Sequence, residues 1–237
     1  MTQRTNARLA GSCFLLYIAT GVASLVVFGR ATRGGDAAAQ LLSIVQHETE
    51  VRLAVLLTLL SFFWAVALGV TLYALTRDED RDLATIAMAC RVGEGVLGAA
   101  GAARLLGLVP IAHAATDTAH RADAAAARAF GALLFAQGGV GVPVTATCFA
   151  VGSAIFAWLF LRARTIPVSL AWLGVIASIL LVAALPLQIA GIVGPAIANV
   201  VWALMALFEV TLALWLIFKG VNPPLHAEGV RSRAVRT

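Results

Sequence analysis

The chain has 237 residues, of which 61% are apolar and 12% are charged. Soluble domains average roughly 45–50% apolar and 25% charged residues. The composition therefore excludes an ordinary soluble fold and predicts one all-α transmembrane helical bundle, because the apolar stretches are long enough to span hydrocarbon. We expect this single domain to cover residues 1–222, followed by a polar tail at 223–237.

The formal net charge of +5 comes mostly from arginines that flank the apolar stretches. Such residues set the orientation in a membrane and contact lipid headgroups. Arginine and lysine do not cluster with interleaved aromatic residues, so nucleic acid is not an expected partner. Cys13, Cys90 and Cys148 lie inside apolar stretches, where cysteine acts as a small hydrophobic residue. The sequence therefore predicts no disulfide framework, and we expect no cofactor.

Six apolar stretches predict six transmembrane helices, since about 20 apolar residues cross a bilayer. They cover residues 9–28, 51–75, 83–109, 141–161, 168–192 and 196–218. The first stretch follows Arg4 and Arg8, as the core of a signal peptide would. It is longer than the roughly 7–15 apolar residues of such a core, so we expect an uncleaved span.

Two segments in the middle of the chain are less regular. Residues 110–128 are too polar for hydrocarbon, and we expect a long connection there that is helical in part. The apolar stretch 130–161 is longer than a core of about 30 Å requires at 1.5 Å per residue. Four residues predict a break in it: Gly138, Gly139, Gly141 and Pro143. We therefore expect the span to begin near residue 141, with residues 130–137 as either an interfacial lead-in or an extra turn.

The positive charges predict the orientation of the bundle. An even number of spans places both termini on one side, together with the connections at 76–82 and 162–167. That side carries about 10 lysines and arginines, against about 6 on the opposite side. Because the more positive side of a membrane protein faces the cytoplasm, we expect both termini there.

Three ionisable residues lie well inside the predicted spans: Arg91 and Glu94 in the third and Glu209 in the sixth. Counted from the cytoplasmic ends at 1.5 Å per residue, all three lie at a depth of roughly 12–16 Å. We therefore expect the third and sixth spans to be neighbours, with Arg91 bridging either Glu209 or Glu94. Gly98 and Gly101 continue the helix face of Arg91, which predicts close approach of another helix there.

This predicted polar network has one acid in excess, which leaves two interpretations open. The spare carboxylate of Glu94 or Glu209 carries a proton or a cation during transport. Alternatively, the network is satisfied and locks two helices together. In that case one acid is protonated or bonded to a hydroxyl, such as that of Tyr17, Thr20 or Ser61.

Two weaker groups of polar residues lie on the predicted outer side. Gln137, Gln188 and Asn199 either line a vestibule or form hydrogen bonds between helices. The spacing of His113, Asp117 and His120 puts them on one face if the segment is helical, and their side chains are good zinc ligands. They are a candidate metal site, with solvated loop residues as the alternative.

The familiar catalytic motifs, including GxSxG, HExxH and the P-loop, are absent from the sequence. This absence favours a structural or accessory membrane subunit. The alternatives are a small proton- or cation-coupled transporter using Glu94 or Glu209, and a membrane enzyme acting on lipid or quinone. The expected partners are the lipid bilayer and another membrane protein or a second copy of the chain.

Several short segments occur in an order that indicates a known family. They are Arg8–Gly11, Val51–Leu53, Leu72–Leu75, Arg91–Glu94, Phe160–Arg162, Ile166–Pro167, Leu173–Val175, Glu209, Ala213–Leu216 and Lys219–Gly220. In these the chain resembles a bacterial multi-pass membrane protein family catalogued as domain of unknown function 4386. The resemblance implies a location in the bacterial cytoplasmic membrane, with Arg91, Glu94 and Glu209 as typical features. The chain departs from the family pattern at Ser169 and in its glycine-rich fourth stretch.

Overall fold

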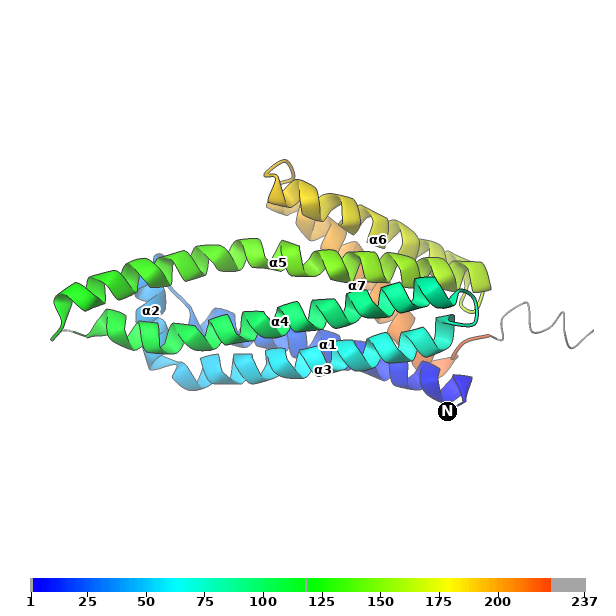
Figure 1. Cartoon of the computed structure of the whole chain (residues 1–237), viewed down its shortest axis with the longest axis horizontal. Coiled ribbons are helices and arrows are strands. Elements are labelled where there is room, and N and C mark those ends of the chain that lie inside the picture. The colour runs from blue at the N-terminus through cyan, green and yellow to red at the C-terminus, as the bar shows by residue number, and fades with distance from the viewer. Residues whose placement is uncertain (1, 118, 223–237) are drawn as a thin grey trace, which may run out of the picture. The chain divides into compact units, whose positions relative to one another are not determined.

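The computed structural model describes residues 2–117 and 119–222, with the side chains of all of them except 137–143. Within this part, every regular element is an α-helix (Figure 1). The helices are α1 (Gln3–Ala31), α2 (Ala37–Gln46), α3 (Glu48–Thr76), α4 (Arg81–Thr116), α5 (Arg121–Ala163), α6 (Val168–Ile189) and α7 (Pro195–Phe218). The predicted all-α class is therefore confirmed.

Six helical segments of the described chain are long and apolar enough to cross a membrane. They are α1, α3, α4, α6, α7 and the Val144–Ala163 part of α5. The short helix α2 connects the first two spans and does not cross. The prediction of six spans is confirmed, and the chain has the architecture of a multi-pass membrane protein.

Helices α4 and α5 are longer than the sequence predicts. Helix α4 continues through Pro110 to Thr116, and α5 already begins at Arg121. The connection expected over residues 110–128 is helical in part, as predicted: residues 110–116 continue α4, and residues 121–128 belong to α5. Alanine is the best helix former, and the alanine-rich sequence on both sides of the turn favours helix despite its polar residues. Asp123 in the first turn of α5 adds a favourable interaction with the helix dipole.

The predicted break in the fourth stretch is wrong, because α5 is one uninterrupted helix of 43 residues. At 1.5 Å per residue it is roughly 65 Å long, about twice the 30 Å thickness of a hydrocarbon core. Among the described residues of α5, the segment Val144–Ala163 is a candidate span. The whole helix is longer than one crossing of the hydrocarbon requires.

The helix ends follow local chemistry. The side chain of Asp36 accepts a hydrogen bond from Ala39 N at 2.7 Å and begins α2, and Asp80 accepts one from Leu83 N at 3.1 Å at the start of α4. Gly191 and Gly220, just beyond α6 and α7, have φ angles of 73° and 78°. This left-handed conformation favours glycine and ends a helix.

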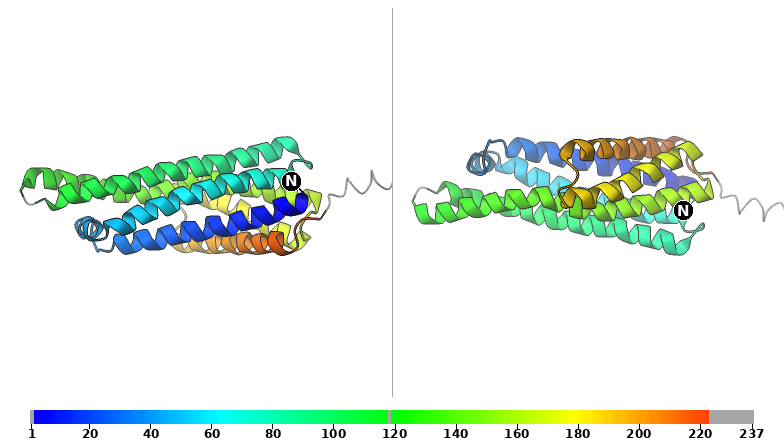
Figure 2. Two further views of the ribbon diagram at one scale, coloured as in Figure 1. Left: turned by 90° about the horizontal axis from the view of Figure 1, so that it is seen from below. Right: turned by 90° about the horizontal axis from the view of Figure 1, so that it is seen from above.

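The chain forms two compact units. The first unit consists of Met1–Leu15, Trp64–Glu94 and Ala146–Thr237, and the second of Leu16–Phe63 and Gly95–Thr145. The first therefore contains α6 and α7 complete, which lie side by side in all the views (Figures 1 and 2). It also contains one end each of α1, α3, α4 and α5, whereas α2 belongs to the second unit.

Each unit has its own apolar core. In the first unit, buried residues such as Phe14, Leu68, Phe160 and Phe208 form one cluster. In the second unit, Leu41 of α2 belongs to a smaller cluster that includes residues near the C-terminus of α4. Polar contacts also join helices in the second unit: the hydroxyl of Ser24 on α1 donates to the carbonyl oxygen of Ala54 on α3 at 2.9 Å.

Candidate functional site

The most strongly buried ionisable group of the first unit is the side chain of Arg91, on α4. Its exposed fraction is 1%, and the fractions for Glu94, Ser153 and Glu209 are 6%, 4% and 5%. These four residues come from α4, α5 and α7 and form what we call the Arg91 network. Burial of three ionisable side chains is unfavourable unless they pair and form hydrogen bonds.

The guanidinium of Arg91 contacts the other three residues directly. Its Nη1 atom donates to Oε2 of Glu94 at 2.9 Å, within the same helix. Its Nη2 atom donates to Oε1 of Glu209 at 3.1 Å and to Oγ of Ser153 at 3.2 Å. One planar, multiply donating group thus links three helices, which a lysine ammonium with its different geometry would not reproduce.

Aromatic rings border the same guanidinium. The Cζ atom of Arg91 lies 4.6 Å from the ring centroid of Phe149 and 5.7 Å from that of Phe14. Phe149 in turn stacks on Trp202, with the ring centroids 5.7 Å apart and an interplanar angle of 20°. The rings exclude water and favour the cation, since a ring face attracts positive charge.

Small residues on the neighbouring helices make room for α4 at the network. A Cβ atom on Gly69 of α3 would lie 3.0 Å from Cβ of Arg91, and one on Gly152 of α5 would lie 3.1 Å from the carbonyl oxygen of Ala87. By contrast, a Cβ atom on Gly98 or Gly101 would meet nothing within 4 Å. The predicted close helix approach at those two glycines is therefore wrong; it occurs at Ala87 and Arg91, about two to four turns earlier on α4.

A small cavity of about 10 Å³ adjoins the network. Arg91 and Ser153 contribute its polar lining, and Phe14, Phe160 and other apolar side chains form the rest. A cavity of this size holds about one water molecule. The space is enough for hydration of the guanidinium or for a single hydrogen-bonded bridge, and too small for an organic substrate.

The network can do two things chemically. It can fix the relative positions of α4, α5 and α7, because the guanidinium of Arg91 contacts a residue on each of these helices. It can also take up a proton or a monovalent cation, because one guanidinium faces two carboxylates and the ionised set carries one negative charge in excess. A buried excess charge is costly, so a bound cation would lower the energy of the ionised set.

Sequence reasoning missed Ser153 and Phe149. The hydroxyls it suggested, those of Tyr17, Thr20 and Ser61, belong to the second unit; Ser61 donates to the carbonyl oxygen of Tyr17 at 3.2 Å. The small pair Gly152–Ser153 was the available signal. Small and hydroxyl-bearing residues are typical of contacts between membrane helices.

The structure describes two of the three outer polar side chains. Gln188 is half-buried near the end of α6, and Asn199 is exposed on α7. The side chain of Gln137 lies outside the described residues. The vestibule and the hydrogen bonds between helices both stay predictions for these residues.

The candidate metal residues form two pairs. Nε2 of His113 lies 3.0 Å from Oε2 of Glu48, and Nδ1 of His120 lies 3.0 Å from Oδ2 of Asp117. Helix α4 ends at Thr116, so the three predicted ligands do not share a helix face. In the described part of the chain, no group of three or more His, Cys, Asp or Glu side chains is placed to hold a metal ion.

The carboxyl group of Asp117 is held ionised by its surroundings. The hydrogen bond with His120 and a second one donated by the backbone N–H of Ala119 lower its pKa from the ordinary value. Both favour the charged carboxylate over the neutral acid.

Six apolar helices and a buried charge network define a polytopic helical membrane protein. Residues 9–220 match the family described as Domain of unknown function (DUF4386). The match covers most of the chain, which therefore belongs to this family, as its resemblance predicts. No curated protein and no solved structure matches the chain.

Proposed function

We propose that this chain is a structural or accessory subunit of the bacterial cytoplasmic membrane, and that the Arg91 network locks its helices into the shape a partner recognises. The observation that carries the proposal is the position of Arg91: at 1% exposure it contacts groups on α4, α5 and α7 at once. Such an arrangement specifies helix packing, because rotation of α7 would separate Glu209 from Arg91, and rotation of α5 would break the hydrogen bond with Ser153.

The size of the adjoining cavity supports the structural role. At about 10 Å³ it admits roughly one water molecule and no solute. A carrier needs a route by which its cargo reaches the binding group. Neither acid belongs to the lining of this cavity, whose polar part comes from Arg91 and Ser153.

The proposed orientation has both termini in the cytoplasm. The connections at residues 77–80 and 164–167 share that side with them. Arg162, at the end of α5, pairs with Glu79 at 3.0 Å and with Asp80 at 3.6 Å, and so ties two of these connections together. The surrounding positive charges favour retention on the cytoplasmic side.

Purification in a mild detergent, at native expression level, tests the subunit proposal. We expect the tagged chain to elute with a second membrane protein, or with a second copy of itself, at a fixed stoichiometry. Arg91→Ala should abolish this association, and Gly98→Ala, at an unobstructed position of the same helix, should preserve it. A monomer that elutes alone from both mild detergent and lipid nanodiscs would contradict the proposal.

A proton- or cation-coupled carrier is the second candidate, favoured by the two carboxylates that face one guanidinium. In this mechanism Glu209 or Glu94 takes up the cation and releases it on the opposite side. Glu209→Gln removes the excess charge with little change of volume. In proteoliposomes containing a pH dye, the carrier requires proton flux that this variant loses; equal flux from wild type, variant and empty liposomes would exclude it.

A further inference from the structure

A second cavity, of about 500 Å³, lies in the second unit. It is formed by α2, the last residues of α4 and the first turns of α5. Its volume is within the roughly 300–1,000 Å³ range of small-molecule sites. The residues that matter for its chemistry are Ala38, Leu41, Leu42, Thr116, Arg121 and Arg128.

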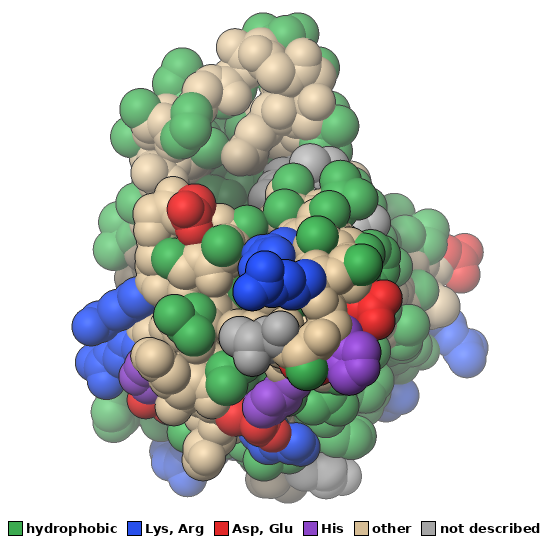
Figure 3. Space-filling model, turned by 90° about the vertical axis from the view of Figure 1, so that its left-hand side faces the viewer, with side chains coloured by type: hydrophobic (Ala, Val, Ile, Leu, Met, Phe, Trp, Pro, Cys, Tyr) green, Lys and Arg blue, Asp and Glu red, His purple; other side chains and the backbone are tan. Residues whose placement is uncertain are grey.

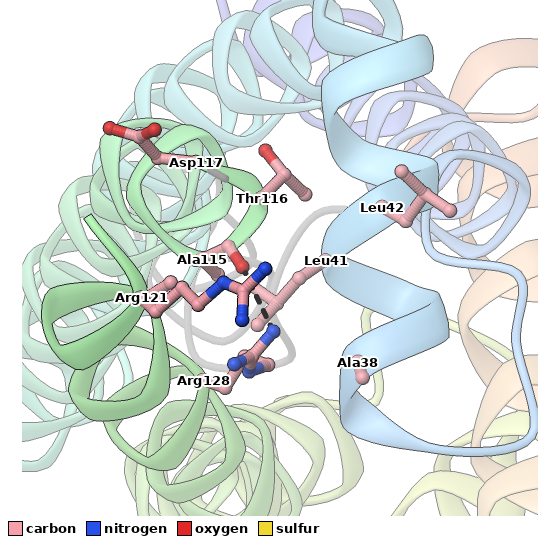
Figure 4. Close-up of a pocket in the computed structure, with 9 residues that line it drawn as sticks. Ala38, Leu41, Leu42, Ala115, Thr116, Asp117, Arg121 and Arg128 are labelled. Carbon is pink, nitrogen blue, oxygen red and sulfur yellow. Dashed lines mark hydrogen bonds between the residues drawn. The ribbon is translucent and has the colours of Figure 1, made fainter. Parts of the chain in front are cut away.

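Two arginines give the cavity a positive side. Arg121 and Arg128 lie two turns apart on α5, and their guanidinium groups converge beside Ala115 (Figure 4). The Nη1 atom of Arg128 donates to the carbonyl oxygen of Ala115 at 3.5 Å, a long contact that leaves most of its donors available. Two like charges that converge in this way repel each other unless an anion lies between them.

No acidic side chain of the described chain forms an ion pair with either arginine. Asp117 also borders the cavity, but its carboxylate points away from both guanidiniums (Figure 4). Its oxygen atoms already accept hydrogen bonds from His120 and from the backbone N–H of Ala119. Among the residues that the structure describes, no acidic side chain therefore compensates the positive charge of the two guanidiniums.

The opposite side of the cavity is apolar. Helix α2 contributes Ala38, Leu41 and Leu42, of which Leu41 is fully buried and Leu42 is exposed. Because α2 is a short helix that connects two candidate spans, α1 and α3, we place it at the membrane interface. On this face of the molecule, basic side chains lie next to apolar ones (Figure 3).

We infer that this cavity binds a phosphate group, with the two guanidiniums of Arg121 and Arg128 as its ligands. Guanidinium forks match phosphate oxygens in geometry and charge, and they form strong charge-assisted hydrogen bonds with them. The hydroxyl of Thr116, whose own proton goes to backbone oxygens at 3.0 Å, is not needed as a donor. The phosphate can come from solution or from the headgroup of an anionic lipid, whose glycerol and chains would contact α2.

Titration of the full chain in a phosphate-free detergent tests the inference. The probes are inorganic phosphate and short-chain phosphatidylglycerol, each measured by calorimetry. The variant Arg121→Gln/Arg128→Gln removes both ligands. The matched control, Arg30→Gln/Arg33→Gln, removes the same two charges from exposed positions of the same unit that do not line the cavity.

The wild type and the matched control should bind at least one probe with similar affinity. The cavity variant should bind it at least about tenfold more weakly, since a hydrogen bond to a charged group contributes roughly this factor or more. Arg121→Gln alone should already weaken binding. Because Arg121 is exposed, this substitution should leave the folded structure intact. Circular dichroism and gel filtration verify that each variant remains folded.

The two probes distinguish the source of the phosphate group. Saturable binding of inorganic phosphate, with little gain from the lipid, indicates a soluble anion. Binding of the lipid alone indicates a headgroup site. The inference is overturned if neither probe binds, or if the matched control loses as much affinity as the cavity variant, because net charge would then explain the effect.

Discussion

At the residue scale, the charge balance in the core of the first unit depends on one side chain. Arg91 is compensated twice, by Glu94 and by Glu209, and it is bordered by the rings of Phe14 and Phe149. Removing it leaves two carboxylates in an apolar environment. Removing one carboxylate leaves a balanced pair, so the two kinds of substitution should have unequal consequences.

Arg91→Met should destabilise the folded protein by about 3–5 kcal/mol, the usual cost of leaving a buried charge uncompensated. Thermal unfolding in detergent, followed by circular dichroism, measures this loss. The combined variant Arg91→Met/Glu94→Gln/Glu209→Leu should recover much of it, because uncharged groups of similar size often replace a buried ion pair at little cost. A triple variant as unstable as Arg91→Met would contradict the electrostatic explanation.

Outside the spans, the pKa of Asp117 shows how much the hydrogen bond with His120 stabilises its carboxylate. Its lowered pKa means that the ionised carboxylate stabilises the folded chain above the ordinary carboxyl pKa, and that this contribution is lost as the pH falls through the lowered value. His120→Ala removes the first cause and should raise the pKa of Asp117 toward its ordinary value. Carbon-13 NMR of labelled aspartate measures the change.

The matched control for this titration is His113→Ala. His113 contacts Glu48 at 3.0 Å instead of Asp117, so this substitution should leave the Asp117 titration where it was. An equal shift in both histidine variants would mean that the cause is a general change of charge near the turn, and the specific hydrogen bond would lose its role.

At the scale of the helices, close packing depends on glycines at positions where a Cβ atom would collide with a neighbouring helix. A Cβ atom on Gly11 of α1 would lie 2.5 Å from the carbonyl oxygen of Ala213 on α7 and 2.7 Å from Cγ1 of Ile217. The backbone oxygen cannot move without displacing α7. By contrast, a Cβ atom on Gly98 of α4 has open space within 4 Å.

Gly11→Ala should therefore lower the stability by roughly 1–3 kcal/mol, the usual cost of overpacking a helix contact. Gly98→Ala should be neutral or stabilise the protein by up to about 1 kcal/mol, because alanine favours helix over glycine. Unfolding in a graded mixture of mild and denaturing detergent compares the two variants. The packing explanation would fail if the two substitutions changed stability equally.

The helix lengths show where sequence patterns mislead. Polar residues at 110–128 predict a long connection, yet α4 and α5 extend into it from both sides. Glycines with Pro143 predict a break in the fourth stretch, yet α5 continues through it. Polarity excludes a segment from hydrocarbon but does not end a helix. A helix in a bundle also tolerates glycine and proline when neighbouring groups stabilise its backbone.

At the scale of the whole molecule, the six spans and the positive charges predict a defined orientation. With Cys13, Cys90 and Cys148 replaced by alanine, a cysteine at Asp78 should react with an impermeant maleimide only after the cytoplasmic side is opened. A cysteine at Gly35 should react in intact cells. The physical reason is the excess of about 10 against 6 positive charges on the side of residues 76–82. The reverse labelling pattern would contradict the predicted topology.

What the sequence by itself determined is the class of protein, the six spans and the membership of its family. Hydropathy and segment length are local properties, so they can be read without knowing which helices touch. The shared depth of Arg91, Glu94 and Glu209 indicated in addition that these residues can meet.

Only the tertiary structure decided how Arg91 is surrounded, and that Arg121 and Arg128 face the same cavity as α2. Ser153 and Glu209 lie 62 and 118 positions from Arg91 along the chain. Whether such residues face one another depends on the rotation of each helix about its axis and on which helices are neighbours. In a chain that is apolar around most of each span, the sequence pattern does not specify that rotation, because lipid and protein present similar apolar surroundings.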